Sequence, residues 1–151
     1  MRKVFAGLAI LLMLAVVAQF FFAASGAFDT APKEESFGAH RALGYGIVLF
    51  SVLTTVAAAL ARVPGRLIGM AGLVAGLGMV QGVIRAVAAA VGETATAGQL
   101  IFGLHAVNGL VIMALVGRIV RQARELSRSA ASTGDAAGAA GSAARPAQAA
   151  S

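Results

Sequence analysis

Four long apolar stretches, separated by short polar segments, dominate the first 117 residues of the chain. They cover residues 4–24, 38–61, 67–91 and 97–117. A membrane-spanning helix needs about 20 consecutive, mostly apolar residues, and each stretch is long enough. The pattern therefore predicts an all-α, polytopic membrane protein whose four transmembrane helices form a bundle.

Composition supports this prediction and excludes several kinds of site. The chain is 59% hydrophobic and 12% charged, whereas soluble domains average roughly 45–50% apolar and 25% charged residues. It has no cysteine, which excludes disulfides, thiolate metal sites, iron–sulfur clusters and haem attached through thioethers. A redox cofactor, if present, must be held noncovalently.

The charged residues predict how the spans are oriented. Most basic residues lie at one set of span ends: Arg2, Lys3, Arg62, Arg66, Arg118, Arg121, Arg124 and Arg128. Four of the six acidic residues lie near the other ends: Asp29, Glu34, Glu35 and Glu93. By the positive-inside rule both termini are expected in the cytoplasm. The basic residues that give the net charge of +6 lie mostly at span ends and form no patch suited to nucleic acid. The lipid bilayer is therefore the expected partner. A membrane-protein partner or homo-oligomer is left open.

The first span has two interpretations. Its basic start, its apolar core and the small residues at Ser25, Gly26 and Ala27 resemble a signal peptide. Its apolar run is about 21 residues long, more than the 7–15 of a signal core. The length favours a retained membrane helix.

The composition changes after Arg128 to alanine, glycine, serine and threonine. Such a segment has too few large apolar residues to order itself. We therefore predict a four-helix transmembrane domain over residues 1–128 and a disordered cytoplasmic tail over residues 129–151. The arginines at the end of the domain suggest a basic juxtamembrane helix, either a topology anchor or a contact for anionic lipid.

A repeated phrase indicates that the four helices are two copies of one hairpin. Residues 37–47 and 102–112 share five identities in eleven positions, including the only two histidines, His40 and His105. Gln19 precedes His40 by 21 positions and Gln81 precedes His105 by 24. Two hairpins in this order have parallel topology, with a pseudo-two-fold axis along the membrane normal.

The two histidines are the main candidates for a functional site. A histidine inside a span is costly and usually faces the bundle interior. Thr30 and Thr96 are predicted helix caps, which would place both rings at a similar depth near the outer face.

A glycine follows each histidine by four residues, one turn deeper on the same helix face: Gly44 and Gly109. The missing side chain would leave room for a flat cofactor. We therefore predict a b-type haem with His40 and His105 as axial ligands of its iron. Two filled axial positions favour electron transfer or haem sensing. Because directly packed helices stand 8–10 Å apart, the two ligand helices would have to be splayed.

Two arginines near the outer face are candidate partners for haem propionates, Arg85 and Arg41, because arginine binds carboxylates bidentately. Arg85 could instead extend to the outer head groups, and Arg41 could lie in an exposed first turn. Each histidine could also be structural, hydrogen-bonded to water or to a neighbouring carbonyl. Gln19 and Gln81 could simply bond across helices.

Two other classes of function remain. Small-xxx-small pairs, Gly72 with Gly76 and Gly78 with Gly82, suggest a cofactor-free membrane subunit or scaffold that packs through glycine-rich faces. A metal-ion site could combine the histidines with Glu34 or Glu35. No general base or nucleophile occurs outside the histidines, so no catalytic residue is assigned and an enzyme is not expected.

Short motifs resemble one four-helix half of haem A synthase. They are His40-Arg41-Ala42-Leu43-Gly44 on the second helix, Gln81-Gly82 on the third and Leu104-His105 on the fourth. The resemblance implies histidines on helices two and four serving a haem near the outer face. The catalytic unit of that family has a glutamate where this chain has Phe37, and its outer cysteine pair is absent, so haem oxidation is not implied. The chain is also similar to small uncharacterised four-helix proteins of the bacterial cytoplasmic membrane, which is its expected location.

Overall fold

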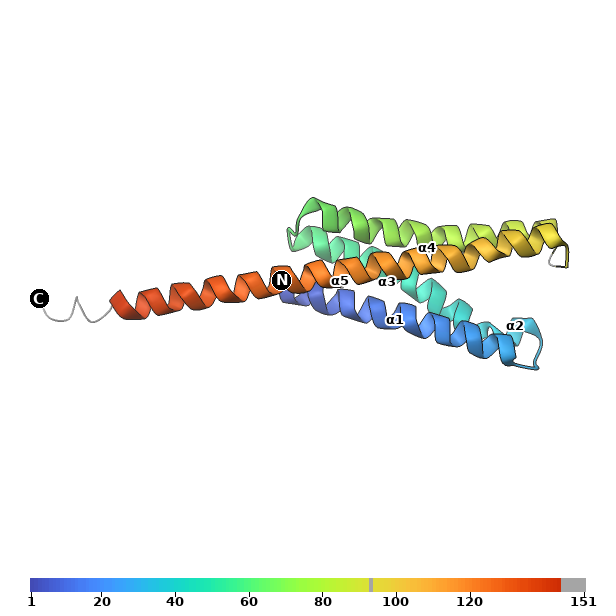
Figure 1. The fold of residues 1–151 in the computed structure, drawn as a ribbon, viewed down its shortest axis with the longest axis horizontal. Coiled ribbons are helices and arrows are strands. Elements are labelled where there is room, and N and C mark those ends of the chain that lie inside the picture. The colour runs from blue at the N-terminus through green and yellow to red at the C-terminus, as the bar shows by residue number, and fades with distance from the viewer. Residues whose placement is uncertain (93, 145–151) are drawn as a thin grey trace, which may run out of the picture.

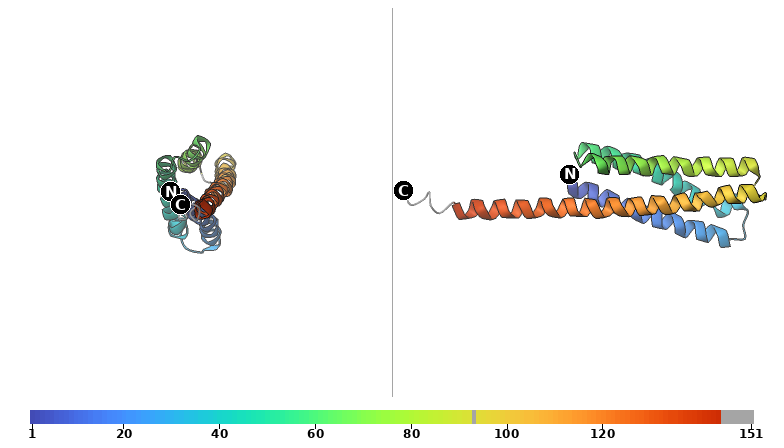
Figure 2. Two further views of the ribbon diagram at one scale, coloured as in Figure 1. Left: turned by 90° about the vertical axis from the view of Figure 1, so that its left-hand side faces the viewer. Right: turned by 45° about the horizontal axis from the view of Figure 1, so that its top comes forward.

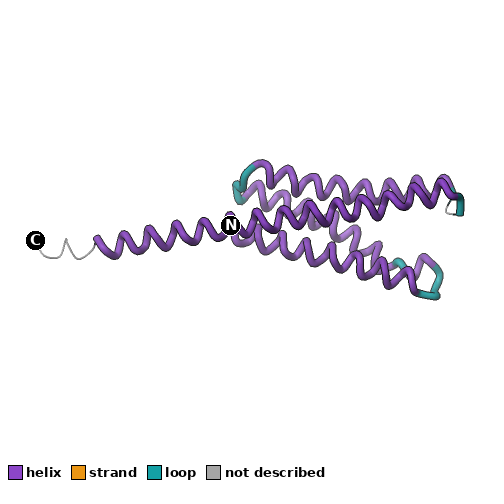
Figure 3. Tube along the Cα trace, in the orientation of Figure 1, coloured by secondary structure: helices purple, strands orange, loops and turns teal. Residues whose placement is uncertain are grey.

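Apart from short connections, the protein is helical in the part of the chain that its computed structural model describes, residues 1–92 and 94–144, with side chains to Ser129. The elements are α1 (Arg2–Phe28), α2 (Lys33–Ser36), α3 (Gly38–Leu60), α4 (Gly65–Val91) and α5 (Thr96–Ala144), shown in Figures 1 and 3. Helices α1, α3, α4 and residues 96–129 of α5 are each long and apolar enough to cross a membrane. The prediction of an all-α bundle with four transmembrane helices is confirmed.

The four long helices stand at the corners of a bundle. Helix α1 packs against α3 and α5, and α4 packs against the same two helices. Seen end-on, α3 and α5 lie at opposite corners, and so do α1 and α4 (Figure 2). The first helices of the two hairpins are therefore diagonal partners, and so are the second helices. This arrangement matches the predicted pair of repeated hairpins.

The apolar core fills only the half of the bundle that carries the basic residues. It contains large side chains that are almost completely buried, among them Phe5, Leu12, Leu67, Val74, Val116 and Ile119. These residues lie in the first half of α1 and α4 and beyond the first twenty residues of α5. Tight packing of such side chains holds membrane helices together, so this half anchors the fold.

The other half of the bundle, towards the acidic loops, is more open. Figure 1 shows α1 and α2 leaning away from α4 and α5 at this end. Large apolar residues there are mostly exposed, for example Phe21, Tyr45 and Leu104. The interior of this half holds polar side chains instead of an apolar core.

The connection between α1 and α3 differs from the sequence prediction. Thr30 caps no helix, because α2 begins three residues later and has Pro32 at its N-cap position. Oδ1 of Asp29 accepts the backbone N–H of Ala31 at 3.0 Å, which closes a turn before the helix. A residue before proline is held away from the helical region, so Ala31 separates Thr30 from α2. Thr96 is the first residue of α5.

Helix α5 continues past the last span to Ala144 and projects far beyond the bundle (Figure 1). Alanine, which is frequent in this segment, has the highest intrinsic helix propensity. The predicted disorder of residues 129–151 stays a prediction. The rest of the predicted tail, residues 145–151, lies outside the described residues.

The glycines of α4 face different surroundings. A Cβ at Gly78 would lie 2.8 Å from Cγ2 of Val48 on α3, and one at Gly72 would lie 3.7 Å from a methyl group of Thr55. A Cβ at Gly76 or Gly82 would meet nothing within 4 Å. One glycine of each small-xxx-small pair therefore supports packing between α3 and α4, and the other leaves open space.

Candidate functional site

Four polar side chains, one from each long helix, converge inside the open half of the bundle. Gln19 is on α1, His40 on α3, Gln81 on α4 and His105 on α5. The imidazole rings of His40 and His105 reach towards each other from opposite corners. Their centroids are 6.1 Å apart and their planes are inclined by 47°. We call these four residues the histidine–glutamine cluster.

His40 is held by Gln19 through three contacts. The Nδ1 atom of His40 lies 3.1 Å from the backbone carbonyl oxygen of Gln19. The Gln19 amide Nε2 donates to the backbone carbonyl of His40 at 2.9 Å and lies 3.3 Å from the ring Nε2. A histidine that donates from Nδ1 to a carbonyl keeps a lone pair on Nε2, which is the usual orientation of a metal-ligating histidine. The predicted cross-helix hydrogen bond of Gln19 is therefore present.

His105 has an equivalent neighbour but weaker polar contacts. The backbone of Gln81 lies beside its ring, as the backbone of Gln19 lies beside His40. Among the described residues, three buried polar atoms have no hydrogen-bond partner: Nδ1 of His105 and Oε1 of both glutamines. A buried polar atom without a partner costs about 1–3 kcal/mol. All three atoms belong to the histidine–glutamine cluster, which marks it as a place that favours a further polar or metal contact.

The glutamine amides occupy the space beside the two repeated glycines. A Cβ at Gly44 would lie 3.1 Å from Nε2 of Gln19, and a Cβ at Gly109 would lie 3.4 Å from Nε2 of Gln81. The sequence predicted that this space is free for a flat cofactor. The room beside each glycine accommodates the glutamine of the same hairpin.

Two phenylalanines contact the histidine rings, a feature that the sequence analysis missed. Phe37 meets His40 edge-on with centroids 6.1 Å apart, and Phe102 stacks on His105 at 5.2 Å. Each phenylalanine lies three residues before its histidine. In the second hairpin this spacing places Phe102 and His105 on the same face of α5. The repeated phrase contained this signal, because Phe and His recur together at the same spacing.

The two predicted arginines lie in different environments. Arg41 forms an ion pair with Glu34, with 3.2 Å between Nη2 and Oε2, and also donates to the backbone carbonyl of Glu34. It therefore ties α3 to α2 at the surface. Arg85 has an exposed side chain one turn beyond Gln81 on α4, near enough to His105 for its charge to act on that ring.

A metal site built from the histidines and an acidic residue is not formed. Among the described residues no three histidine, aspartate or glutamate side chains come together. The carboxylate of Glu34 is directed to Arg41 instead.

The spacing of the two histidine rings is compatible with two axial haem ligands, and the glutamines lie beside it. An iron–nitrogen bond is about 2 Å long and a ring centre lies roughly 1 Å beyond its nitrogen, so two axial imidazoles have centres about 6 Å apart. The observed separation is 6.1 Å. The ring nitrogen Nε2 of His40 lies 3.3 Å from the Gln19 amide. Both histidines could hold a haem only if this amide turned aside.

Comparison with known proteins identifies a similar family without an activity. Residues 19–89 match the profile of a family described as "Family of unknown function (DUF6220)". This segment starts at Gln19, includes His40 and Gln81, and ends before His105. No curated protein and no solved structure matches the chain. The chain is thus an integral membrane protein of unknown function with a four-helix bundle, and its resemblance to haem A synthase stays a prediction.

Proposed function

We propose that this protein binds one b-type haem between His40 and His105 for electron transfer or haem sensing. The observation that carries the proposal is the 6.1 Å separation of two imidazoles that come from opposite corners of the bundle. A haem held there would supply reversible one-electron chemistry.

The chain itself supplies the orientation of the ligands. The carbonyl of Gln19 fixes the His40 ring through Nδ1, which leaves the lone pair on Nε2, now in contact with the Gln19 amide, for an iron atom once that amide moves. The Gln81 backbone lies beside His105 in the equivalent place. With both histidines bound to the iron, small ligands such as oxygen would have no open coordination site. This favours electron transfer or sensing over oxygen chemistry.

Arg85 is the stronger candidate for a propionate partner. Its side chain is exposed one turn beyond Gln81 on α4, whereas Arg41 would first have to release Glu34. Bidentate binding of a carboxylate would hold the cofactor edge towards the outer surface. We expect Arg85→Gln to weaken haem retention and Arg41→Gln to affect it less.

The test is an absorption spectrum of the purified full chain in detergent, after expression with ample haem. The wild type is expected to show the Soret and sharp reduced α bands of a six-coordinate, low-spin haem. His40→Ala and His105→Ala should each lose the low-spin spectrum, and added imidazole should restore it. Tyr45→Phe, a change at an exposed residue near His40, serves as the control and should leave the spectrum unchanged.

Two results would contradict the proposal. One is a wild-type protein without a Soret band, even after reconstitution with haem. The other is a full low-spin spectrum in both histidine variants. Gel filtration and circular dichroism establish that each variant is folded, so that loss of haem can be separated from loss of the bundle.

A cofactor-free membrane subunit is the second candidate, and two observations favour it. The Gln19 amide already contacts the His40 ring nitrogen, and the glutamine amides pack against both glycines. In this case the cluster would be a polar contact that fixes the rotation of the helices. The open positions Gly76 and Gly82 on α4 would then be available to another helix.

We further propose that the protein lies in the bacterial cytoplasmic membrane with both termini in the cytoplasm. The support is the distribution of arginine and lysine, which gather at the apolar-core end of the bundle.

A further inference from the structure

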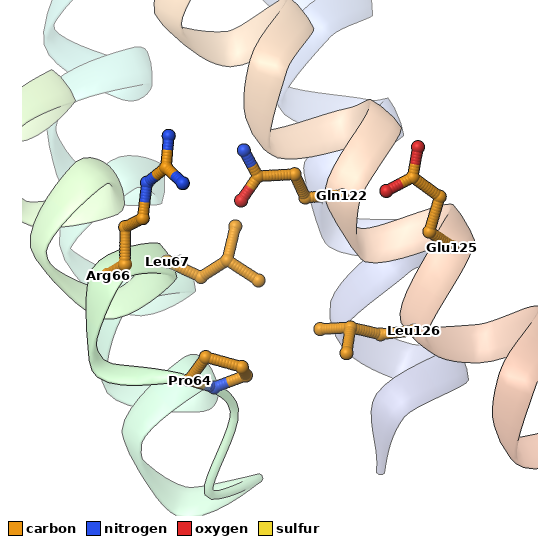
Figure 4. A pocket seen from close by; sticks show the side chains of 6 residues that line it. All are labelled: Pro64, Arg66, Leu67, Gln122, Glu125 and Leu126. Atoms are coloured by element: carbon orange, nitrogen blue, oxygen red, sulfur yellow. The ribbon is translucent and has the colours of Figure 1, made fainter.

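A second polar site lies at the basic end of the bundle, between the start of α4 and the later part of α5. It is a pocket of about 430 Å³, shown in Figure 4. Its lining residues are Pro64, Arg66, Leu67, Gln122, Glu125 and Leu126. This pocket lies at the end of the bundle opposite the histidine–glutamine cluster and shares no residue with it.

The pocket carries one positive and one negative group on opposite walls. Figure 4 shows Arg66 on α4 and Glu125 on α5, with the amide of Gln122 extending from α5 towards Arg66. Arg66 and Glu125 both have exposed side chains. In the part of the chain that the structure describes, no ion pair joins either of them to another side chain. Two opposite charges are therefore available to one ligand.

The position of the pocket places it at the level of lipid head groups. Arg66 is the second residue of α4, and the apolar stretch of that helix begins at the next residue. Glu125 lies eight residues beyond the end of the apolar stretch of α5, about 12 Å at 1.5 Å per residue. The head-group region adds roughly 5–8 Å to each side of the hydrocarbon core, so Arg66 lies at the level of the head groups and Glu125 at their aqueous edge. A ligand that contacts Arg66 is therefore at the membrane surface.

We propose that this pocket binds a phospholipid with a primary amine in its head group, such as phosphatidylethanolamine. The lipid phosphate would contact Arg66 and its ammonium group would contact Glu125, with Gln122 as a further hydrogen-bonding group. Pro64, Leu67 and Leu126 offer apolar contacts to the glycerol and the first methylene groups. A choline head group has no N–H to donate to Glu125, and an anionic glycerol head group has no positive charge to place beside it.

The experiment compares three lipids with identical acyl chains, carrying ethanolamine, choline or glycerol head groups. Each is titrated into the purified full chain in detergent, and bound lipid is counted by native mass spectrometry. We expect the ethanolamine lipid to bind about fivefold more tightly than the choline lipid, as for a partly exposed charge pair. Glu125→Gln should abolish this ratio, and Arg66→Gln should weaken both lipids about fivefold.

The control variant is Arg121→Gln, an exposed arginine one turn before Glu125 that does not line the pocket. It should keep the wild-type ratio of ethanolamine to choline lipid. This ratio is measured within each variant, so it does not depend on how much of the protein is folded. Equal binding of the two lipids by the wild type, or an unchanged ratio in Glu125→Gln, would overturn the proposal. Tighter binding of the glycerol lipid than of the ethanolamine lipid would also overturn it, because this result would indicate attraction by the surrounding arginines alone.

Discussion

The imidazole rings of His40 and His105 stand 6.1 Å apart although the residues are 65 positions apart in the sequence. They lie on α3 and α5, at opposite corners of the bundle (Figure 2). Gln19 and Gln81 occupy the other diagonal. These four side chains lie at the level where the apolar core ends and the helices begin to diverge. A haem shared by the histidines would have to displace the Gln19 amide from the His40 ring nitrogen, and this competition can be measured.

The first prediction concerns this competition and separates the two candidate functions. Gln19→Ala removes the amide that donates to the His40 carbonyl and contacts the ring Nε2, but it keeps the backbone carbonyl that orients the ring. If the site binds haem, affinity should rise, because one obstacle to the macrocycle is gone. The unfolding free energy of the haem-free protein should fall by about 0.6 kcal/mol, the average for a polar contact between membrane helices.

Haem titration followed at the Soret band measures the affinity, and unfolding in mixed detergent and dodecyl sulfate micelles measures the stability. Gln99→Ala is the matched control, since Gln99 is exposed and lies outside the cluster. Loss of haem binding in Gln19→Ala, with the bundle still folded, would show that the glutamine assists the ligand and that the competition does not exist.

The second prediction concerns the contact between α3 and α4. Gly78→Ala places a Cβ 2.8 Å from a methyl group of Val48, whose β-branched side chain has little freedom to move away. The helices must separate, which should cost about 1–3 kcal/mol. Gly82→Ala, one turn later on α4, meets nothing within 4 Å and should be neutral or slightly stabilising. Equal stability of the two variants, measured by micelle unfolding, would contradict the packing described.

The third prediction concerns Asn108, which donates from its side-chain amide to the backbone carbonyl of Leu77 at 2.9 Å. This bond joins α5 to α4 a turn below His105. Asn108→Leu should lower the unfolding free energy by about 0.6 kcal/mol, and by at most about 1.7 kcal/mol. The control is Val107→Leu, because Val107 is exposed on the same helix. A stabilised Asn108→Leu protein would argue against the bond.

The fourth prediction concerns topology and uses the absence of cysteine from the chain. Ala95→Cys, in the acidic connection before α5, should react with a membrane-impermeant maleimide added to intact cells. Gly65→Cys, at the first residue of α4, should react only after the membrane is opened. Both positions are exposed, so a difference in labelling reports the side of the membrane. The reverse pattern would place both termini outside.

The sequence by itself determined the number and limits of the spans and the pairing of the hairpins. Apolar runs predicted α3 and α4 to within a few residues, because the length of a span is set by the thickness of the bilayer. The repeated phrase predicted that His40 and His105 belong at equivalent places, since two copies of a hairpin present equivalent faces. The limits of a span depend only on the local run of apolar residues. The pairing of the hairpins follows from comparing one part of the sequence with another.

Only the tertiary structure decided how the side chains share the interior. It placed the glutamine amides against Gly44 and Gly109 and directed Arg41 to Glu34. It also stacked Phe102 on His105 and confined the apolar core to one half of the bundle. The physical reason is that hydropathy does not encode the rotation of each helix about its axis or the distance between diagonal helices. Both depend on the simultaneous fit of side chains from four separate segments.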